Sequence, residues 1–353
     1  MKTYYVGMDV HQASIAIVVL NGAGKVVEVS TLKTGVAAIR SYLQRWKGRV
    51  LVTFEEGTQA QWLYDVVQPL VTAVIVCDPR QNRLLAAGNK SDRIDAQKLA
   101  ELLRNGSLQA VDHHDYGVRV LKELVRNYEC LVQDTARVMN RLKAIYRGRA
   151  IACQGHELYR PDRSQQWLRK LKEPGAKARA SFLYEQLAVL RPLRQQAKLV
   201  MLRAARKQAA YPWLLSVPRL GPVSVAQVLA IVGSPHRFRS KRQFWTYVGL
   251  AVVTRTSAEQ EVVNGVLRRS RRPIATRGLN RNHNHLLKRV FKTAATSACQ
   301  RGPFSAAYEA RVKRGMDPAL ARLTIARQIA AITLSLWKHG ELFQVEKMKM
   351  PAT

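Results

Sequence analysis

Four acidic residues in the N-terminal part of the chain have the types and the spacing to hold divalent metal ions. Asp9 lies in an apolar run, Val6-Gly7-Met8-Asp9-Val10, and Glu55 ends a second one, Val52-Thr53-Phe54-Glu55. A carboxylate in an apolar strand is costly to bury unless it binds something. Asp92 and Asp95 lie three apart at the expected start of a helix, so both point the same way. Four convergent carboxylates suit Mg²⁺, or two Mg²⁺ ions about 4 Å apart that activate the attacking group and steady the leaving oxygen of a phosphodiester.

Each acid also has a simpler structural explanation. Asp92 could be a helix N-cap, Asp95 a first-turn acid favoured by the helix dipole, and Asp9 an acceptor for backbone donors. Glu56 is adjacent to Glu55, but strand alternation sends the two side chains to opposite faces. The coincidence of all four acids at strand ends and on one helix face favours the metal site.

Alternating strands and helices must position these acids. Strands are predicted from apolar, β-branched runs at 4–10, 14–20, 26–32, 49–54 and 71–77. Helices are predicted from apolar spacing at 36–46, 62–70 and about 94–103. Three strands in a meander followed by alternating helix and strand is the order of an α/β RNase H-like domain, which we predict for residues 1–112. In that fold the first and fourth strands are neighbours, so Glu55 is expected to face Asp9.

A helical region is predicted for residues 113–209. Its first helix has apolar residues at intervals of three and four, which form an a/d seam: Leu121, Leu124, Tyr128, Leu131, Thr135, Val138, Leu142 and Ile145. A second helix, from Phe182 to about Arg206, should kink or split at Arg191-Pro192. The two helices either pack on each other within one chain or form a dimeric coiled coil. The basic, turn-rich stretch 148–176 predicts a loop or hinge.

A mainly α-helical domain is predicted for residues 210–345. Residues 216–226 resemble a helix-hairpin-helix element, in which Gly221 permits a tight turn and backbone N–H groups grip a DNA phosphate. A plain connection between core helices fits the pattern as well. Phosphate contact is favoured by four nearby basic residues, Arg237, Arg239, Lys241 and Arg242. The apolar helix Ala319–Trp337 is expected to be core.

The net charge of +34, from 58 Lys and Arg against 24 Asp and Glu, implies a polyanionic partner. Nucleic acid is favoured because phosphate neutralisation releases counterions. No basic amphipathic helix supports a membrane surface, and no apolar run reaches the roughly 18 residues of a membrane span. The start of the chain has no signal-peptide pattern, and the four cysteines are far apart and lack zinc-finger spacing. We therefore expect a cytoplasmic protein.

Several motifs resemble those of the DEDD transposases of bacterial insertion sequences, which are bridge-RNA-guided recombinases. The motifs extend over nearly the whole chain: Gly7-Met8-Asp9-Val10-His11, Phe54-Glu55-Glu56-Gly57, Asp78-Pro79-Arg80, residues 90–96, residues 218–222, Phe238-Arg239-Ser240, residues 247–250 and Arg255-Thr256-Ser257. The resemblance implies an RNase H-like domain of the Holliday-junction-resolvase (RuvC-like) type, an α-helical coiled-coil insertion for dimerisation, and a C-terminal transposase domain that offers a serine to the acidic site.

The resemblance also implies roles for particular residues. The metal-binding catalytic carboxylates would be Asp9, Glu55, Asp92 and Asp95, and the nucleophile would be Ser257, which forms a covalent phosphoserine link to DNA. The family often has Ser-Gly-Gly near this serine, whereas this chain has Ser257-Ala258-Glu259, so Thr256 and Ser270 are alternatives.

Basic residues near that serine are predicted to contact phosphates or the RNA backbone. Together with the hairpin, the predicted nucleic-acid-binding residues are Arg219, Gly221, Arg255, Arg268, Arg269, Arg271 and Arg272. A solvated charged face is the alternative explanation for the arginines.

We therefore expect a Mg²⁺-dependent, site-specific DNA transposase or recombinase. Its expected partners are double-stranded DNA, a structured noncoding RNA and further copies of itself in a homodimer or homotetramer, at the bacterial nucleoid. One competing hypothesis is a junction-resolving nuclease with the same acids and water as the nucleophile. A second is an actin-like or sugar-kinase-like ATPase, because Gly7-Met8-Asp9 before a hairpin resembles a phosphate loop. A third is a non-catalytic RNA-binding protein.

Overall fold

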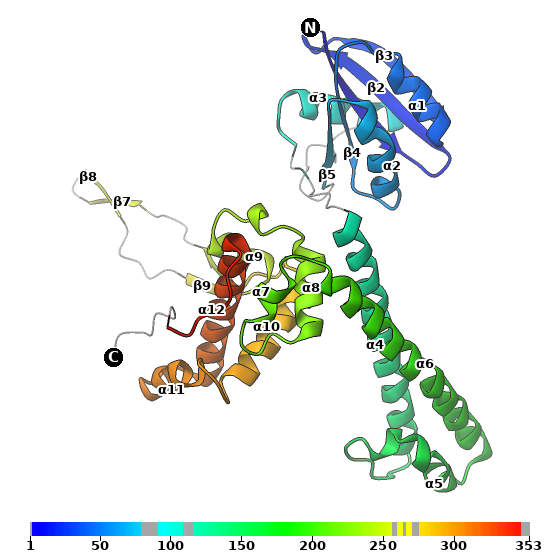
Figure 1. Ribbon diagram of the computed structural model, residues 1–353, viewed down its shortest axis with the longest axis vertical. Helices are drawn as coiled ribbons and strands as arrows, with labels where there is room; N and C mark the ends of the chain where they lie inside the picture. Colours follow the sequence, from blue (N-terminus) through cyan, green and yellow to red (C-terminus); the bar gives the residue numbers. More distant parts are fainter. Residues whose placement is uncertain are drawn as a thin grey trace. The chain divides into compact units, whose positions relative to one another are not determined.

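The computed structural model divides into two units, Met1–His113 and His114–Thr353, here the N-terminal unit and the helical unit. It describes residues 2–78, 91–108, 110, 116–255, 260–263, 266–269 and 275–346. The N-terminal unit mixes strands and helices, whereas the helical unit is mainly α (Figure 1). An α/β domain followed by a mainly helical region agrees with the prediction from the sequence.

Five strands form one mixed sheet in the order β3-β2-β1-β4-β5. Their bounds are β1 (Thr3–Val10), β2 (Ser14–Asn21), β3 (Val26–Lys33), β4 (Arg49–Glu55) and β5 (Ala73–Cys77). The first three strands are an antiparallel meander, and β4 and β5 run parallel to β1. The expected pairing of the first and fourth strands is thus present.

Helices cover both faces of this sheet (Figure 1). The helices α1 (Val36–Gln44) and α2 (Ala60–Val67) lie on the face to which Val6, Met8 and Phe54 contribute. The other face packs on α3 (Asp92–Arg104) through the small residues Ala96 and Ala100. The predicted helix 62–70 divides into α2 and a 3-10 turn, η1 (Gln68–Leu70), since Pro69 has no N–H to continue the α-helical pattern.

Two long helices, α4 (Tyr116–Arg147) and α6 (Pro174–Arg206), lie side by side in the helical unit (Figure 1). The seam of α4 is largely buried, with Leu121 and Leu142 fully so. The two helices therefore pack on each other within one chain, which is one of the two arrangements that the sequence allowed. The second helix is not split at Pro192, because α6 continues through it with buried residues on both sides, such as Leu187 and Ala197. A kink at this position stays a prediction.

The stretch between these helices is a packed segment and not the loop or hinge that we predicted. It contains η3 (Glu157–Tyr159), η4 (Pro161–Arg163) and α5 (Ser164–Arg169). Its buried side chains join those of α4 and α6 in one hydrophobic cluster, to which Leu158, Trp167 and Leu168 belong. These apolar residues are irregularly spaced, so periodicity could not reveal them.

The remaining helices share one core with the nearer ends of α4 and α6. They are α7 (Tyr211–Leu215), α8 (Pro222–Val232), α9 (Lys241–Tyr247), α10 (His285–Ala298), α11 (Ser305–Lys313) and α12 (Pro318–His339), with a 3-10 turn, η5 (Pro235–Arg237). Among the described helices, α12 is long and apolar enough to cross a membrane. Its buried Ala321, Ile325 and Ile329 make it a core helix, as predicted.

Two small sheets interrupt these helices. One pairs β6 (Val252–Arg255) with β9 (Ala275–Leu279), and the other pairs β7 (Gln260–Val263) with β8 (Val266–Arg269). Both pairs are antiparallel. They flank the positions of the candidate serines.

Candidate metal centre

The sheet register brings Asp9 and Glu55 together. The parallel pairing of β1 with β4 ends at Met8↔Phe54, and the next residues in register are Asp9 and Glu55. Met8 and Phe54 belong to the core on the α1 and α2 side. Because strand residues alternate between faces, Asp9 and Glu55 lie on the α3 side.

Close packing of α3 on β1 places the other two acids beside this edge. A Cβ atom at Gly7 would lie 2.0 Å from the carbonyl oxygen of Ala96 and 2.6 Å from the backbone nitrogen of Ala100. Only a glycine allows the helix to approach the strand this closely. The first turn of α3 carries Asp92 and Asp95, so the approach delivers both to the end of β1.

Ser91, and not Asp92, caps this helix. The Ser91 hydroxyl accepts a hydrogen bond from the Ile94 N–H at 3.3 Å, and the helix begins at Asp92. The N-cap explanation for Asp92 is therefore wrong, and the Asp92 carboxylate is not needed to cap the helix.

The four carboxylates interact electrostatically. Burial raises the pKa of Asp9, and the charges of Asp92 and Asp95 raise it further, while His11 lowers it. Burial also raises the pKa of Glu55, with added repulsion from Asp9, Asp95 and Asp78. The site thus concentrates negative charge that a divalent cation would neutralise.

Asp95 supplies an acceptor that lacks a donor. Its Oδ1 atom is buried and has no hydrogen-bond partner among the described residues. The Nζ atom of Lys98 is 3.9 Å from this oxygen, which is beyond hydrogen-bond reach. Since buried polar atoms are normally satisfied, this oxygen suits a role as a metal ligand.

His11 is the member of the site to which the sequence analysis assigned no role. Its Nε2 atom lies 3.2 Å from Asp9 Oδ2 and 3.5 Å from Asp92 Oδ1. Within the described part of the chain, Asp9, His11 and Asp92 form a group whose potential ligand atoms all lie within 4.8 Å of one another. The position of His11 two residues after Asp9, at the end of a strand, was a usable signal, because residues two apart in a strand face the same way.

A cavity of about 440 Å³ opens beside the carboxylates. It is lined by Val10 at the end of β1, by His11 just after it, by Glu55, and by the loop from Gly57 to Gln59 that leads into α2. A substrate phosphate in this cavity would lie next to Glu55 and His11.

Family models match most of the chain. A DEDD transposase model of the IS110 family matches residues 6–148, and a model described as transposase of the IS116/IS110/IS902 family matches residues 211–309. The chain belongs to this family. No curated protein matches it. It is thus an insertion-sequence transposase, a DNA-binding enzyme that cuts and rejoins DNA, in a family that typically uses divalent metal ions.

The hairpin of the transposase differs from the prediction at its turn. Gly221 has φ −72° and ψ 169°, an extended conformation that any residue adopts, and it is the N-cap of α8. The left-handed residue is Arg219, with φ 68°. The predicted role of Gly221 in the tight turn is therefore wrong.

Two arginines near the hairpin already bind backbone carbonyls. The Arg219 guanidinium donates to the carbonyl oxygen of Arg301 from Nε at 3.3 Å and from Nη2 at 3.1 Å. Arg237 Nη1 donates to the carbonyl oxygen of Val232, at the end of α8, at 3.0 Å. These contacts shape the fold, and a phosphate contact by Arg219 stays a prediction.

The other predicted residues of the transposase lie in or near the two small sheets. Arg255 ends β6, and Arg268 and Arg269 lie on β8. The candidate nucleophile Ser257, with Thr256, Ser270, Arg271 and Arg272, lies outside the described residues. Their roles remain predictions.

Proposed function

We propose that this transposase cuts and rejoins DNA by metal-dependent transesterification, with Mg²⁺ held by Asp9, Glu55, Asp92 and Asp95. The observation that carries the proposal is the convergence of these acids from β1, β4 and α3 around a buried Asp95 oxygen without a donor. The sheet order supports an RNase H-like (RuvC-like) domain for residues 1–112.

Each acid has a distinct part in holding the ion or ions. Asp9 and Glu55 lie at the ends of the adjacent strands β1 and β4 and would bind the ion from the sheet. Asp92 and Asp95 lie in the first turn of α3 and would bind the ion from the helix. Bound Mg²⁺ would act as a Lewis acid on the scissile phosphate and stabilise the departing oxygen.

Ser257 is the proposed nucleophile. Its Oγ atom would bond to the DNA phosphorus while its proton passes to water, and the bond from phosphorus to the departing strand end would break. The departing oxygen would take up a proton from water and leave as a hydroxyl. The covalent phosphoserine keeps the energy of the broken bond for rejoining. The family membership and the motif Arg255-Thr256-Ser257 support this proposal.

The nucleic-acid partners are proposed to be double-stranded DNA and a structured noncoding guide RNA at the nucleoid. The net charge of +34 supports extensive phosphate contact. Arg255, Arg268 and Arg269, with Arg271 and Arg272, are the proposed contacts of the domain 210–345.

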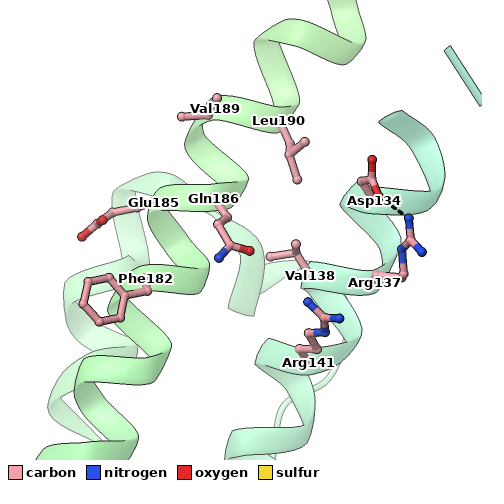
Figure 2. Close-up of a pocket in the computed structure, with 9 residues that line it drawn as sticks. All are labelled: Asp134, Arg137, Val138, Arg141, Phe182, Glu185, Gln186, Val189 and Leu190. Carbon is pink, nitrogen blue, oxygen red and sulfur yellow. Dashed lines mark hydrogen bonds and ion pairs between the residues drawn. The ribbon is translucent and has the colours of Figure 1, made fainter. Parts of the chain in front are cut away.

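Residues 113–209 are the proposed dimerisation region. Four apolar residues on α6 are exposed at intervals of seven, four and seven: Phe182, Val189, Leu193 and Val200. A groove of about 720 Å³ between α4 and α6 adjoins this stripe (Figure 2). It is walled by Phe182 and Val189 on α6 and by Val138 and Arg141 on α4. A heptad-like apolar stripe outside the intrachain seam supports a homodimer or homotetramer.

The metal site is tested with Asp9→Asn and Asp92→Asn. We expect both variants to lose excision by at least about 100-fold, because Lewis-acid stabilisation supplies several kcal/mol, while DNA binding persists. Excision is measured on a donor plasmid and binding by fluorescence anisotropy. Asp65→Asn, on α2 of the same unit, is the control. Retained excision in either site variant contradicts the carboxylate assignment.

The nucleophile is tested with Ser257→Ala. We expect the covalent protein–DNA adduct, seen on a denaturing gel, to disappear in this variant and to persist in Ser270→Ala. An undiminished adduct removes Ser257 as the nucleophile. If the wild type cuts DNA without any adduct, water is the nucleophile and the resolvase hypothesis holds.

A further inference from the structure

The half-exposed imidazole of His11 lies beside two of the four carboxylates, although the four-acid site does not require a nitrogen ligand. Its Nε2 atom is 3.2 Å from Asp9 Oδ2 and 3.5 Å from Asp92 Oδ1, so it bridges the strand end and the first turn of α3. Adjacent ligands of an octahedral ion with metal–ligand distances of 2.0–2.1 Å are roughly 3 Å apart. The two distances from His11 therefore fit neighbouring positions around one cation, and the potential ligand atoms of all three side chains lie within 4.8 Å of one another.

The backbone of His11 is held in place independently of this cluster. The His11 N–H donates to the carbonyl oxygen of Ser14 at 2.9 Å, and the Thr34 hydroxyl donates to the carbonyl oxygen of His11 at 2.9 Å. These bonds fix the backbone that carries the imidazole, and the contact of Nε2 with Asp9 Oδ2 orients the ring. A ligand positioned in advance loses little freedom when it binds an ion.

We infer that His11 Nε2 is a direct ligand of the divalent ion shared with Asp9 and Asp92. This inference rests on the proposed metal-dependent function and adds a nitrogen donor to the carboxylates. Imidazole suits transition metals such as Zn²⁺, Fe²⁺ and Ni²⁺, whereas carboxylate and water suit both Mg²⁺ and Mn²⁺. Of these two ions, Mn²⁺ belongs to the transition series and accepts a nitrogen ligand more readily. The site should therefore bind Mn²⁺ more tightly than Mg²⁺, and His11 should account for the difference.

The test uses the full-length, tag-free transposase and Mn²⁺ as the probe. Pulsed electron paramagnetic resonance of bound Mn²⁺ should show the nuclear coupling of a directly bound imidazole nitrogen. The coupling should disappear in His11→Ala and in His11→Gln, each checked for native folding by circular dichroism. His236→Ala, which removes an exposed histidine of the helical unit, should keep it.

Affinity gives a second measurement. We expect His11→Ala to weaken Mn²⁺ binding by at least about tenfold, since even outer-shell partners of a metal contribute 10–100-fold. Mg²⁺ binding, measured by competition with Mn²⁺, should change much less.

The outcomes separate this inference from the proposed function. If Mn²⁺ binds and Asp9→Asn abolishes binding, but no nitrogen coupling is seen, His11 is not a ligand and the carboxylate site stands. If the wild type binds no Mn²⁺ in its N-terminal unit, both proposals are overturned.

Discussion

At the candidate metal centre, acidic side chains lie close together although their mutual repulsion lowers the stability of the protein without an ion. Burial and neighbouring acids raise the pKa of Asp9 and Glu55. A raised carboxyl pKa means that the folded chain binds the proton more tightly than the unfolded chain does. The stability of the ion-free protein should therefore fall as the pH rises from the ordinary Glu pKa of 4.5 through the raised value.

The first prediction concerns Glu55→Gln. In metal-free buffer at neutral pH this variant should unfold at a higher temperature than the wild type, because it removes a partly buried and repelled charge. Added Mg²⁺ should raise the unfolding temperature of the wild type more than that of the variant. Differential scanning fluorimetry measures both effects. Glu101→Gln, an exposed acid on α3, makes the same charge change outside the cluster and should show neither.

At the scale of elements, the site depends on how closely α3 approaches β1. Gly7, Ala96 and Ala100 leave no side-chain layer between helix and strand. This contact, and not a property of α3 alone, sets the distance from Asp92 and Asp95 to Asp9.

The second prediction concerns Gly7→Ala. The new methyl group meets helix backbone, which must move, so we expect a loss of about 1–3 kcal/mol in the free energy of unfolding, the usual cost of overpacking. We also expect weaker Mn²⁺ binding, since α3 carries two of the proposed ligands. Urea unfolding and Mn²⁺ titration measure these changes. Gly22→Ala, whose Cβ would meet nothing within 4 Å, is the matched control. Unchanged Mn²⁺ affinity in Gly7→Ala would show that α3 does not position the ligands.

At the scale of the whole molecule, the exposed apolar stripe on α6 is the proposed interface with a second copy of the chain. Phe182 is 62% and Val189 59% exposed, which is unusual for large apolar side chains on one helix face. Both adjoin the groove with α4 (Figure 2). The seam of α4 already packs within the chain, so the stripe on α6 is the surface that we propose for a second copy.

The third prediction concerns the double variant Phe182→Glu and Val189→Glu. The dimer dissociation constant should increase by at least about 100-fold, because each apolar side chain buried in the interface contributes roughly 1.5–3 kcal/mol. Sedimentation velocity measures the constant. Leu199→Glu, also exposed on α6 but on another side of the helix, should leave it unchanged. Equal dissociation constants for the double variant and the wild type would exclude this stripe as the interface.

The sequence by itself determined the acids and the elements that carry them. Asp9 lies in one apolar, β-branched run and Glu55 ends another, while Asp92 and Asp95 begin a helix whose end at Asn105-Gly106 is also visible locally. Such patterns depend on neighbours along the chain, so they need no knowledge of packing. The motifs likewise carried the family, which the family models confirmed.

Tertiary structure alone decided the rest. The close approach at Gly7, the place of His11 between Asp9 and Asp92, and the packed stretch between α4 and α6 all involve residues distant in sequence. The left-handed turn at Arg219 likewise lies beside Arg301, far along the chain. Periodicity describes only which way a side chain points within its own element. The partner that it meets depends on how the elements pack, and that packing turns four separate acids and one histidine into a single site.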